Sequence, residues 1–463
     1  MLTSPACHRA RATPMQRALH ALIALFCVLL AACATAPRPD LARLYRVADN
    51  ASDTTPLVLI PGLFGSKLRD RRTGAEVWPG SGYDVLFSDY QRLALRFDPT
   101  SLQVLADSLE AYDIADQVLG RDIYGPIVKT LERYGGYVRG VPGTPVKPGE
   151  RRYYVFPYDF RQDNTQHAQA LERLIDTIRQ DYGDPGLRVD FVAHSMGGLV
   201  ARYYLRYGTS RVRKFILLGT PNLGSVSSLH AFLAGEPIGL GRIPPEVLAT
   251  LPSGYELFPH PLLSWLIDAE GHTLHEDLFA PETWQRYRWG VYDPAVEARL
   301  LGPGGPQASA RLAALRRFFA YRLERARRFL WALSTPEPAT PIRYVLFGGD
   351  CGLTPARLLM EQDKGQPQVR LTPGDIRHPQ PGVPYEELML EPGDGRVTKP
   401  SLLARESLDP MDEQSEDNFL PIAYWFFLCE NHDQLTNNIN FQDNLLNVLL
   451  SRNLPWEGAA GGK

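Results

Sequence analysis

The chain has 463 residues, and its 49 lysines and arginines nearly balance its 52 aspartates and glutamates, which gives a net charge of −3. A composition of 44% hydrophobic and 22% charged residues is typical of a globular protein with a large core. It excludes collagen, a coiled coil, wholesale disorder and a polytopic membrane protein, and the near-neutral charge argues against nucleic acid as the main partner.

The N-terminus has the pattern of an export signal. Residues 1–17 carry three arginines and no acid, and the apolar run Ala18–Leu30 is shorter than the roughly 20 residues of a membrane-spanning helix. The run ends in Leu30-Ala31-Ala32-Cys33, which is similar to a bacterial lipobox and implies removal of residues 1–32 and a lipid on Cys33. The alternative is a plain secretory signal with an incidental cysteine. We therefore expect an exported protein, lipid-anchored to the bacterial cell envelope at the outer membrane and facing the periplasm, with residues 33–53 as a linker.

Short apolar runs alternate with helical patterns along the rest of the chain. The predicted strands are Leu57–Ile60, Tyr153–Phe156, Asp190–Ala193, Lys214–Leu218, Ile342–Phe347 and Ala423–Leu428. The predicted helices cover residues 166–182, 197–207 and 435–452. This alternation predicts an α/β fold, with a mostly parallel sheet flanked by helices and its chemistry at the carboxyl ends of the strands.

Two stretches interrupt the alternation. Residues 226–340 are mostly helical, hold no convincing strand and are expected to form a helical cap. Residues 352–422 are rich in proline and are expected to form a long irregular excursion. At about 150 residues a domain the length would suggest about three domains. The pattern instead predicts one α/β core in two parts, residues 54–225 and 341–455, with the cap between them.

A serine follows the strand that ends at Ala193, in the sequence Ala193-His194-Ser195-Met196-Gly197, and a helical pattern follows it. This is the strand–turn–helix context of a nucleophile elbow, G-x-S-x-G, with alanine in the first glycine position. The sharp turn needs small residues two before and two after the serine, which Ala193 and Gly197 provide. The alternative is a serine that only caps the helix.

Two backbone N–H groups are needed for an oxyanion hole beside this serine. One is expected from Met196, directly after the nucleophile, and the other from the loop after an early strand. That loop is Pro61-Gly62-Leu63-Phe64-Gly65, in which the glycines let the backbone approach a substrate. Leu63 is the preferred donor and Phe64 the reserve, and the alternative is an ordinary Pro-Gly turn.

A general base is expected after the serine and the acid in chain order. Of the ten histidines only His432 directly follows a late strand, so it is the predicted base. For the acid, the residues leave two alternatives: Asp350, directly after a strand, and Asp394, in a glycine-flanked turn. His272 and His275 in the cap resemble a metal pair, but no third ligand has matching spacing, and we expect no metal and no cofactor.

Six motifs together resemble the lecithin:cholesterol acyltransferase family, which includes the lysosomal phospholipase and the phospholipid:diacylglycerol acyltransferases. They are Val58–Leu63, Pro157-Tyr-Asp-Phe-Arg161, Ala193–Gly198, Gly219-Thr-Pro-Asn222, Gly393-Asp-Gly395 and His432. The resemblance spans residues 54–450 and implies an α/β-hydrolase fold with a helical cap. It also implies that Asp394 is the acid of a triad with Ser195 and His432, and that Leu63 serves the oxyanion hole. Arg396 departs from the family, which often has threonine there.

These residues predict a serine esterase, lipase or O-acyltransferase that forms an acyl-serine intermediate from lipid esters such as phospholipids. The alternatives are a carboxylesterase for small non-lipid esters and a catalytically silent lipid-binding lipoprotein. The expected partners are an acyl-ester substrate and, through the lipid anchor, a membrane, with no nucleic acid. We expect a monomer.

Two further features bear on the architecture. Cys351 and Cys429 each end one of two strands expected to be sheet neighbours, so in an exported protein they predict a disulfide that clamps the acid and base loops together. Residues 311–333 form a basic amphipathic helix, which is either a cap helix with a solvated arginine face or a helix that lies on a membrane.

Overall fold

The computed structural model describes residues 38–451 apart from 47, 49–52, 81–87, 89, 119–120, 208–210, 303–304, 335–341 and 406–419. The chain divides into two units, residues 1–40 and 41–463, and every helix and strand named below lies in the second unit. The expected signal peptide, residues 1–32, and the expected lipidated Cys33 lie outside the described residues.

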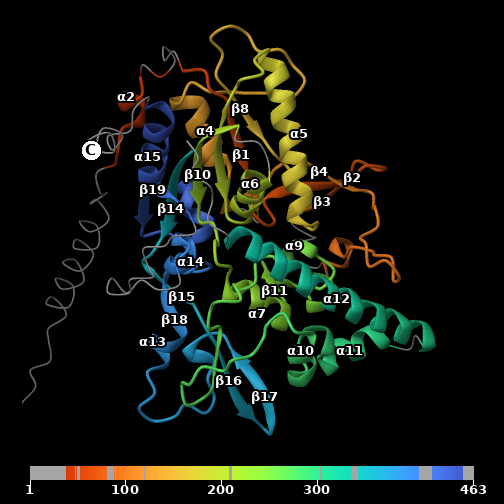
Figure 1. The fold of residues 1–463 in the computed structure, drawn as a ribbon. Helices are drawn as coiled ribbons and strands as arrows, with labels where there is room; N and C mark the ends of the chain where they lie inside the picture. The colour runs from red at the N-terminus through yellow and green to blue at the C-terminus, as the bar shows by residue number, and fades with distance from the viewer. Residues whose placement is uncertain are drawn as a thin grey trace, which may run out of the picture. The chain divides into compact units, whose positions relative to one another are not determined.

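A seven-stranded sheet lies at the centre of the second unit (Figure 1). Its order is β19–β14–β10–β9–β1–β8–β7, and all neighbouring strands are parallel. The strands are β1 (Leu57–Ile60), β7 (Val138–Arg139), β8 (Arg152–Val155), β9 (Val189–His194), β10 (Val212–Leu218), β14 (Arg343–Gly349) and β19 (Ile422–Leu428). The six strands expected from apolar runs are all present, so the predicted parallel sheet is confirmed.

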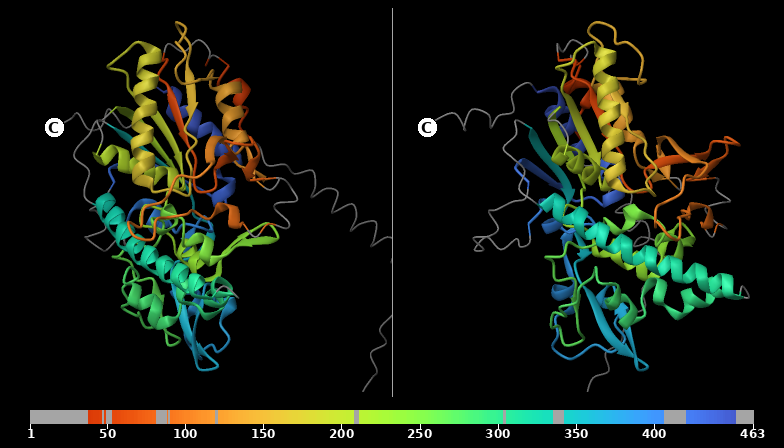
Figure 2. Two further views of the ribbon diagram at one scale, coloured as in Figure 1. Left: turned by 90° about the vertical axis from the view of Figure 1, so that its right-hand side faces the viewer. Right: turned by 45° about the vertical axis from the view of Figure 1, so that its right-hand side comes forward.

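Helices cover both faces of this sheet (Figure 2). On one face α5 (Asn164–Tyr182) and α6 (Met196–Tyr207) pack against strand residues such as Phe191. On the other, α4 (Gly125–Tyr134) and α15 (Ile439–Leu450) pack against residues such as Val192. Successive side chains of a strand point to opposite faces, so a sheet covered on both sides needs continuous apolar strands. The fully buried Leu-Val-Leu-Ile of β1 meets that need.

Several short elements lie outside the main sheet in the first part of the chain: among the described residues, one helix precedes β1, and the others lie between β1 and α4. An antiparallel sheet of order β3–β2–β4 follows the loop after β1. The elements are α2 (Leu41–Leu44), β2 (Ser66–Asp70), β3 (Glu76–Trp78), η2 (Gln91–Leu93), β4 (Leu109–Ile114), β5 (Gln117–Val118) and β6 (Arg121–Asp122). None was expected from the sequence, because these strands are short and only partly buried and lack a regular alternation.

The cap segment is mostly helical as expected, but the expectation that it holds no strand is wrong, because its described residues include three short strands. β11 (Glu236–Ile238) and β12 (Gly241–Ile243) form a hairpin. The two-residue β13 (Leu266–Ile267) pairs in parallel with β16 (Leu358–Asp363), which lies in the proline-rich excursion. The helices are α7 (Val226–Ala234), α8 (Pro245–Leu248), α9 (Pro252–Tyr255), α10 (Pro281–Tyr287), η3 (Gly290–Tyr292), α11 (Pro294–Leu301) and α12 (Gly305–Ser334).

The excursion after β14 is also more ordered than expected. β16 continues into a hairpin with β17 (Gln366–Arg370), and β15 (Gly352–Pro355) pairs with β18 (Leu390–Gly393). The remaining elements are η4 (Pro373–Asp375), α13 (Tyr385–Met389), α14 (Lys399–Leu403) and η6 (His432–Asn437). The parallel pairing of β13 with β16 joins the two insertions into one sheet, a contact between distant segments that local sequence patterns do not encode.

The basic amphipathic helix is the 30-residue α12. Most of its apolar side chains, including Leu315, Phe319 and Leu323, are buried in the core, whereas Trp331 is exposed. Arg322 and Arg325 both contact the carboxylate of Asp163 at the start of α5. These contacts favour the cap-helix interpretation over the membrane-surface one. Within the described part of the chain, no helix has both the length and the apolar character that crossing a membrane requires.

Candidate active site

Ser195 lies on a sharp turn between β9 and α6. Its φ is 52°, in the left-handed region that a residue with a side chain rarely adopts, and its N–H donates to the carbonyl of Leu218 at 2.8 Å. The turn depends on glycine, because a Cβ at Gly197 would lie 2.4 Å from the Pro61 carbonyl oxygen, and one at Gly198 would lie 2.1 Å from Oγ1 of Thr220. The local geometry is therefore that of a nucleophile elbow rather than of a simple helix cap.

His432 and Asp394 meet Ser195 from the two last loops at this end of the sheet. His432 Nε2 lies 2.9 Å from Ser195 Oγ, and His432 Nδ1 lies 2.7 Å from Asp394 Oδ2. The N–H of His432 also donates to the Asp394 carbonyl oxygen at 2.9 Å, which ties the two loops together. Asp394 Oδ1 accepts from the N–H groups of Arg396 at 3.0 Å and Val397 at 2.7 Å. The arrangement is a hydrogen-bonded Ser–His–Asp chain.

Asp350, the alternative acid, lies elsewhere. Its carboxylate accepts from Lys399 Nζ at 2.7 Å, and both side chains are about a quarter exposed. Although Asp350 ends a strand of the main sheet, its side chain pairs with a surface cation and not with His432. Of the two acids that the sequence left open, the structure brings Asp394 to the histidine.

The charge of Asp394 sets the basicity of His432. Burial is the largest single influence and lowers the pKa of the imidazole, but the charge and hydrogen bond of Asp394, together with the charge of Asp433, outweigh it, so the pKa of His432 is raised above its ordinary value. Arg396 opposes the rise. A raised pKa in the partner of a serine hydroxyl favours acceptance of the serine proton.

The expected oxyanion loop lies directly against the serine. A Cβ at Gly62 would be 2.8 Å from Ser195 Cβ, so only glycine allows the loop to approach this closely. Leu63 and Phe64 line the same hollow as Ser195, and Met196 begins α6 directly after the serine. The structure thus brings Leu63 and Met196 to the site as the sequence predicted, and their role as donors remains a prediction.

Tyr124 was not expected at the site, yet it holds both the loop and the elbow. The N–H of Gly62 donates to the Tyr124 hydroxyl at 2.7 Å, and the hydroxyl lies 2.7 Å from His194 Nδ1. The hydroxyl accepts from Gly62 and can donate its own proton to His194 Nδ1, the other polar atom in contact with it, and that donation places the His194 proton on Nε2. Burial lowers the pKa of His194 to about 3, so this histidine is neutral. The isolated tyrosine, 62 residues after Gly62, carries no local signal of this role.

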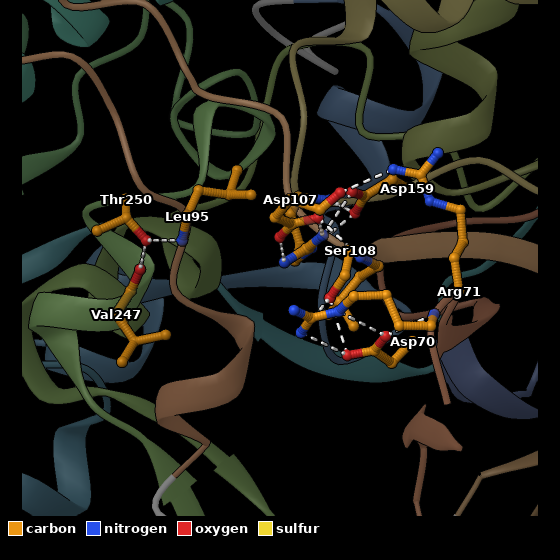
Figure 3. A network of polar contacts seen from close by, with 11 residues as sticks. Asp70, Arg71, Leu95, Asp107, Ser108, Asp159, Val247 and Thr250 are labelled. Carbon is orange, nitrogen blue, oxygen red and sulfur yellow. Dashed lines mark hydrogen bonds and ion pairs between the residues drawn. The ribbon is translucent and has the colours of Figure 1, made fainter. Parts of the chain in front are cut away.

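The Pro157–Arg161 motif braces the same loop from the other side. The Tyr158 hydroxyl donates to the Pro61 carbonyl at 2.6 Å, and the ring of Phe160 packs edge-on against Phe64. The fully buried Arg161 binds Asp159 and Asp107. Figure 3 shows these two carboxylates in one network with Ser108 and Asp70.

A second contact in Figure 3 connects the segment after η2 to the cap. The Leu95 N–H donates to the Thr250 hydroxyl at 3.0 Å, which donates to the Val247 carbonyl at 2.7 Å. Thr250 lies between Leu248 and Leu251, two residues that line the hollow in front of Ser195. This contact therefore anchors one wall of that hollow.

Two hollows open on Ser195 and His432. The first, the apolar chamber, is walled mainly by four buried side chains of the cap, namely Phe232, Leu248, Leu251 and Leu257. Val397, in the loop after β18, completes this wall. The second, the polar chamber, has the larger polar share of the two, because Tyr124, His194 and Asp433 line it together with Trp78, strand β11 and the apolar side chains of Leu63, Phe64 and Ile123. An ion pair between Glu236 of β11 and Arg396, 2.8 Å long, lines both chambers.

Cys351 and Cys429 are joined by a disulfide, with their Cα atoms 4.9 Å apart. The bond links the turn after β14 to the end of β19. Both segments border the loops that carry Asp394 and His432, since β15 directly follows Cys351 and pairs with β18. The disulfide therefore fixes the ends of the two segments that bring the acid and the base together.

The cap histidines contribute nothing to this site. His272 lies 3.3 Å from Asp268 and is largely exposed. In the part of the chain that the structure describes, no group of three or more His, Cys, Asp or Glu side chains is arranged to hold a metal ion.

The seven-stranded parallel sheet, its flanking helices and the serine elbow define the α/β-hydrolase class. A chain of the crystal structure of the Tle4–Tli4 complex has the same fold, with a TM-score of 0.59 and 18% sequence identity. That superposition covers 86% of this chain and 98% of the other.

Within this class the chain is similar to the lecithin:cholesterol acyltransferase family, whose model matches residues 146–277. The lysosomal phospholipase A and acyltransferase of Rattus norvegicus is 29% identical over 182 residues, 37% of this chain and 39% of that protein. The phosphatidylcholine-sterol acyltransferase of Gallus gallus is 33% identical over 92 residues, 18% of this chain and 22% of that protein. The chain thus spans about two fifths, or less, of the length of the relatives it matches.

Proposed function

We propose that the protein is a serine-dependent acyl-ester hydrolase or O-acyltransferase of the lecithin:cholesterol acyltransferase family, acting on lipid esters. The observation that carries the proposal is the contact of Ser195 Oγ with His432 Nε2 at 2.9 Å, on a serine held at a φ of 52°. The apolar chamber beside Ser195 supports an acyl chain as the bound group. The similarity to a phospholipase A and acyltransferase supports lipid esters as the substrate class.

The mechanism assigns a role to each residue. His432 Nε2 accepts the Ser195 proton as Oγ attacks the ester carbonyl carbon, and Asp394 stabilises the imidazolium that forms. The N–H groups of Leu63 and Met196 hold the oxyanion, each lowering the barrier by about 3 kcal/mol. His432 then gives the proton to the leaving alcohol. In the second half, water or another alcohol gives a proton to His432 and attacks the acyl-serine, and Ser195 leaves with that proton.

Incubation of the purified protein with phospholipid vesicles, with and without an acceptor alcohol, tests this function. We expect fatty acid release or a new ester, and covalent labelling of Ser195 by a fluorophosphonate. Ser195→Ala should abolish all three, whereas Ser101→Ala on an exposed turn should abolish none. Full activity in Ser195→Ala would overturn the proposal.

We also propose that the protein is exported and anchored by a lipid on Cys33. The disulfide between Cys351 and Cys429 supports an oxidising compartment outside the cytosol. Metabolic labelling with a radioactive fatty acid in a bacterial host tests the anchor. The expected label should disappear in Cys33→Ala, and label that persists in that variant would contradict the anchor.

A further inference from the structure

The two chambers at Ser195 differ in chemistry, and an ester bound at the serine has two substituents to place. The acyl chain continues from the carbonyl carbon and the alcohol from the ester oxygen, and the two diverge at the reacting centre. The apolar chamber is walled by leucine, phenylalanine and valine and suits the acyl chain. The alcohol is then left to the polar chamber, and His432, the group that gives the leaving alcohol its proton, lines both chambers and can reach it there.

Three charged side chains, Glu236, Arg396 and Asp433, line the polar chamber, and all three also border the apolar chamber. Glu236 and Arg396 neutralise each other across a 2.8 Å ion pair. Asp433 follows His432, lines both chambers and is half-buried. Its carboxylate forms no hydrogen bond or ion pair with any described residue, and only its main-chain carbonyl accepts one, from Gln434. The three charged side chains of the lining therefore leave a net charge of −1 beside the base, and Asp433 interacts with Arg396 and His432 only through space.

The Asp433 carboxylate determines which kind of alcohol binds favourably in the polar chamber. A carboxylate only accepts hydrogen bonds, so it favours a group that donates them, such as a hydroxyl or an ammonium. An apolar alcohol would desolvate the carboxylate and leave it unpaired, which is unfavourable. The chamber also has a volume of about 410 Å³, which far exceeds the roughly 30 Å³ that one water molecule occupies in the liquid.

We propose that the polar chamber binds the alcohol part of the ester, and that Asp433 makes the enzyme select a small polar alcohol carrying hydroxyl or ammonium donors over an apolar one. This inference rests on the proposed function. In acylation the alkoxy oxygen leaves the carbonyl carbon and takes from His432 the proton that came from Ser195. In transfer the same chamber holds the acceptor, whose hydroxyl proton passes to His432 as its oxygen bonds to the acyl carbon and Ser195 Oγ is released.

Two isosteric esters test the selection. In 2,3-dihydroxypropyl butanoate and 2-methylbutyl butanoate the acyl groups are identical, and each hydroxyl of the first is a methyl group in the second. We expect the full-length protein to prefer the dihydroxypropyl ester by at least about tenfold in kcat/KM, after normalisation to the hydroxide-catalysed rates, because a hydrogen bond to a charged group contributes about that factor. Glycerol and 2-methylbutan-1-ol as acceptors should give the same order.

The variants separate the role of Asp433 from that of the triad. Asp433→Leu should lower the preference by about tenfold, with Asp433→Asn as the milder variant if the leucine protein does not fold. Glu387→Gln, which removes an exposed charge on α13, should leave the preference unchanged. If the wild-type protein hydrolyses both esters through Ser195 but its kcat/KM for the dihydroxypropyl ester is no higher than that for the methylbutyl ester, the chamber assignment is overturned and the proposed function stands. An unchanged preference in both Asp433 variants would overturn the role of Asp433. If neither ester is hydrolysed and fluorophosphonate leaves Ser195 unlabelled, the proposed function fails and the selection fails with it.

Discussion

Replacing Asp394 with asparagine separates the two acids that the sequence left open. Asp394 Oδ1 accepts two backbone N–H groups, from Arg396 and Val397, while Oδ2 accepts the His432 Nδ1 proton. An asparagine must keep its oxygen on the two N–H groups. In the flipped amide its NH2 group would face the N–H groups of Arg396 and Val397, and each of these two donors would lose its acceptor at a cost of about 1–3 kcal/mol. The NH2 group of the asparagine therefore faces His432 Nδ1 and donates to it.

That donation forces the His432 proton onto Nε2, the nitrogen that must accept the Ser195 proton. We expect kcat to fall by about 10⁴, the effect of the wrong tautomer in a Ser–His–Asp triad, with little change in KM. Asp350→Asn is the matched control, since it breaks only the partly exposed pair with Lys399, a contact worth about 0–1 kcal/mol of stability.

Hydrolysis of a soluble p-nitrophenyl ester provides the assay, with thermal unfolding of both variants as the check on folding. The reasoning is refuted if Asp394→Asn retains more than about a tenth of the wild-type kcat while Asp350→Asn loses most of it.

Three further results are expected. Activity should fall as the pH is lowered through the pKa of His432, because protonated His432 cannot accept the Ser195 proton, and the raised pKa places this fall above the ordinary histidine value. In Asp394→Asn the acidic limb of the kcat/KM profile should move to lower pH. An acidic limb that does not move would assign it to another group. Gly198→Ala should give an unstable or inactive protein, because its Cβ would lie 2.1 Å from a threonine oxygen, and a variant with wild-type melting temperature and kcat would contradict that packing. Reduction of the disulfide, or its removal in a Cys351→Ser and Cys429→Ser double variant, should lower the free energy of unfolding by up to about 4.5 kcal/mol, the loop-entropy value for a sequence separation of 78 residues, as measured in urea. An equal stability in both states would argue against a closed bond.

Much of the core could be predicted because local patterns encode it. Continuous apolar runs such as Leu57–Ile60 indicate strands buried on both faces, and the helical spacing of residues 166–182 indicates a helix that covers one face. The cap and the excursion could not be predicted to the same degree. Their strands are two to six residues long, and β13 finds its partner in β16, about 90 residues further along the chain.

The sequence by itself determined the serine elbow, the order of the reacting groups and the choice of His432, because a strand, a tight turn with small residues and a helix are local features. The residues themselves left Asp350 and Asp394 open and the family resemblance implied Asp394, but only the tertiary structure shows which carboxylate reaches the imidazole, because both acids follow strands. The same holds for Tyr124, because its partners Gly62 and His194 lie 62 and 70 residues away in the chain and only the folded structure brings them into contact.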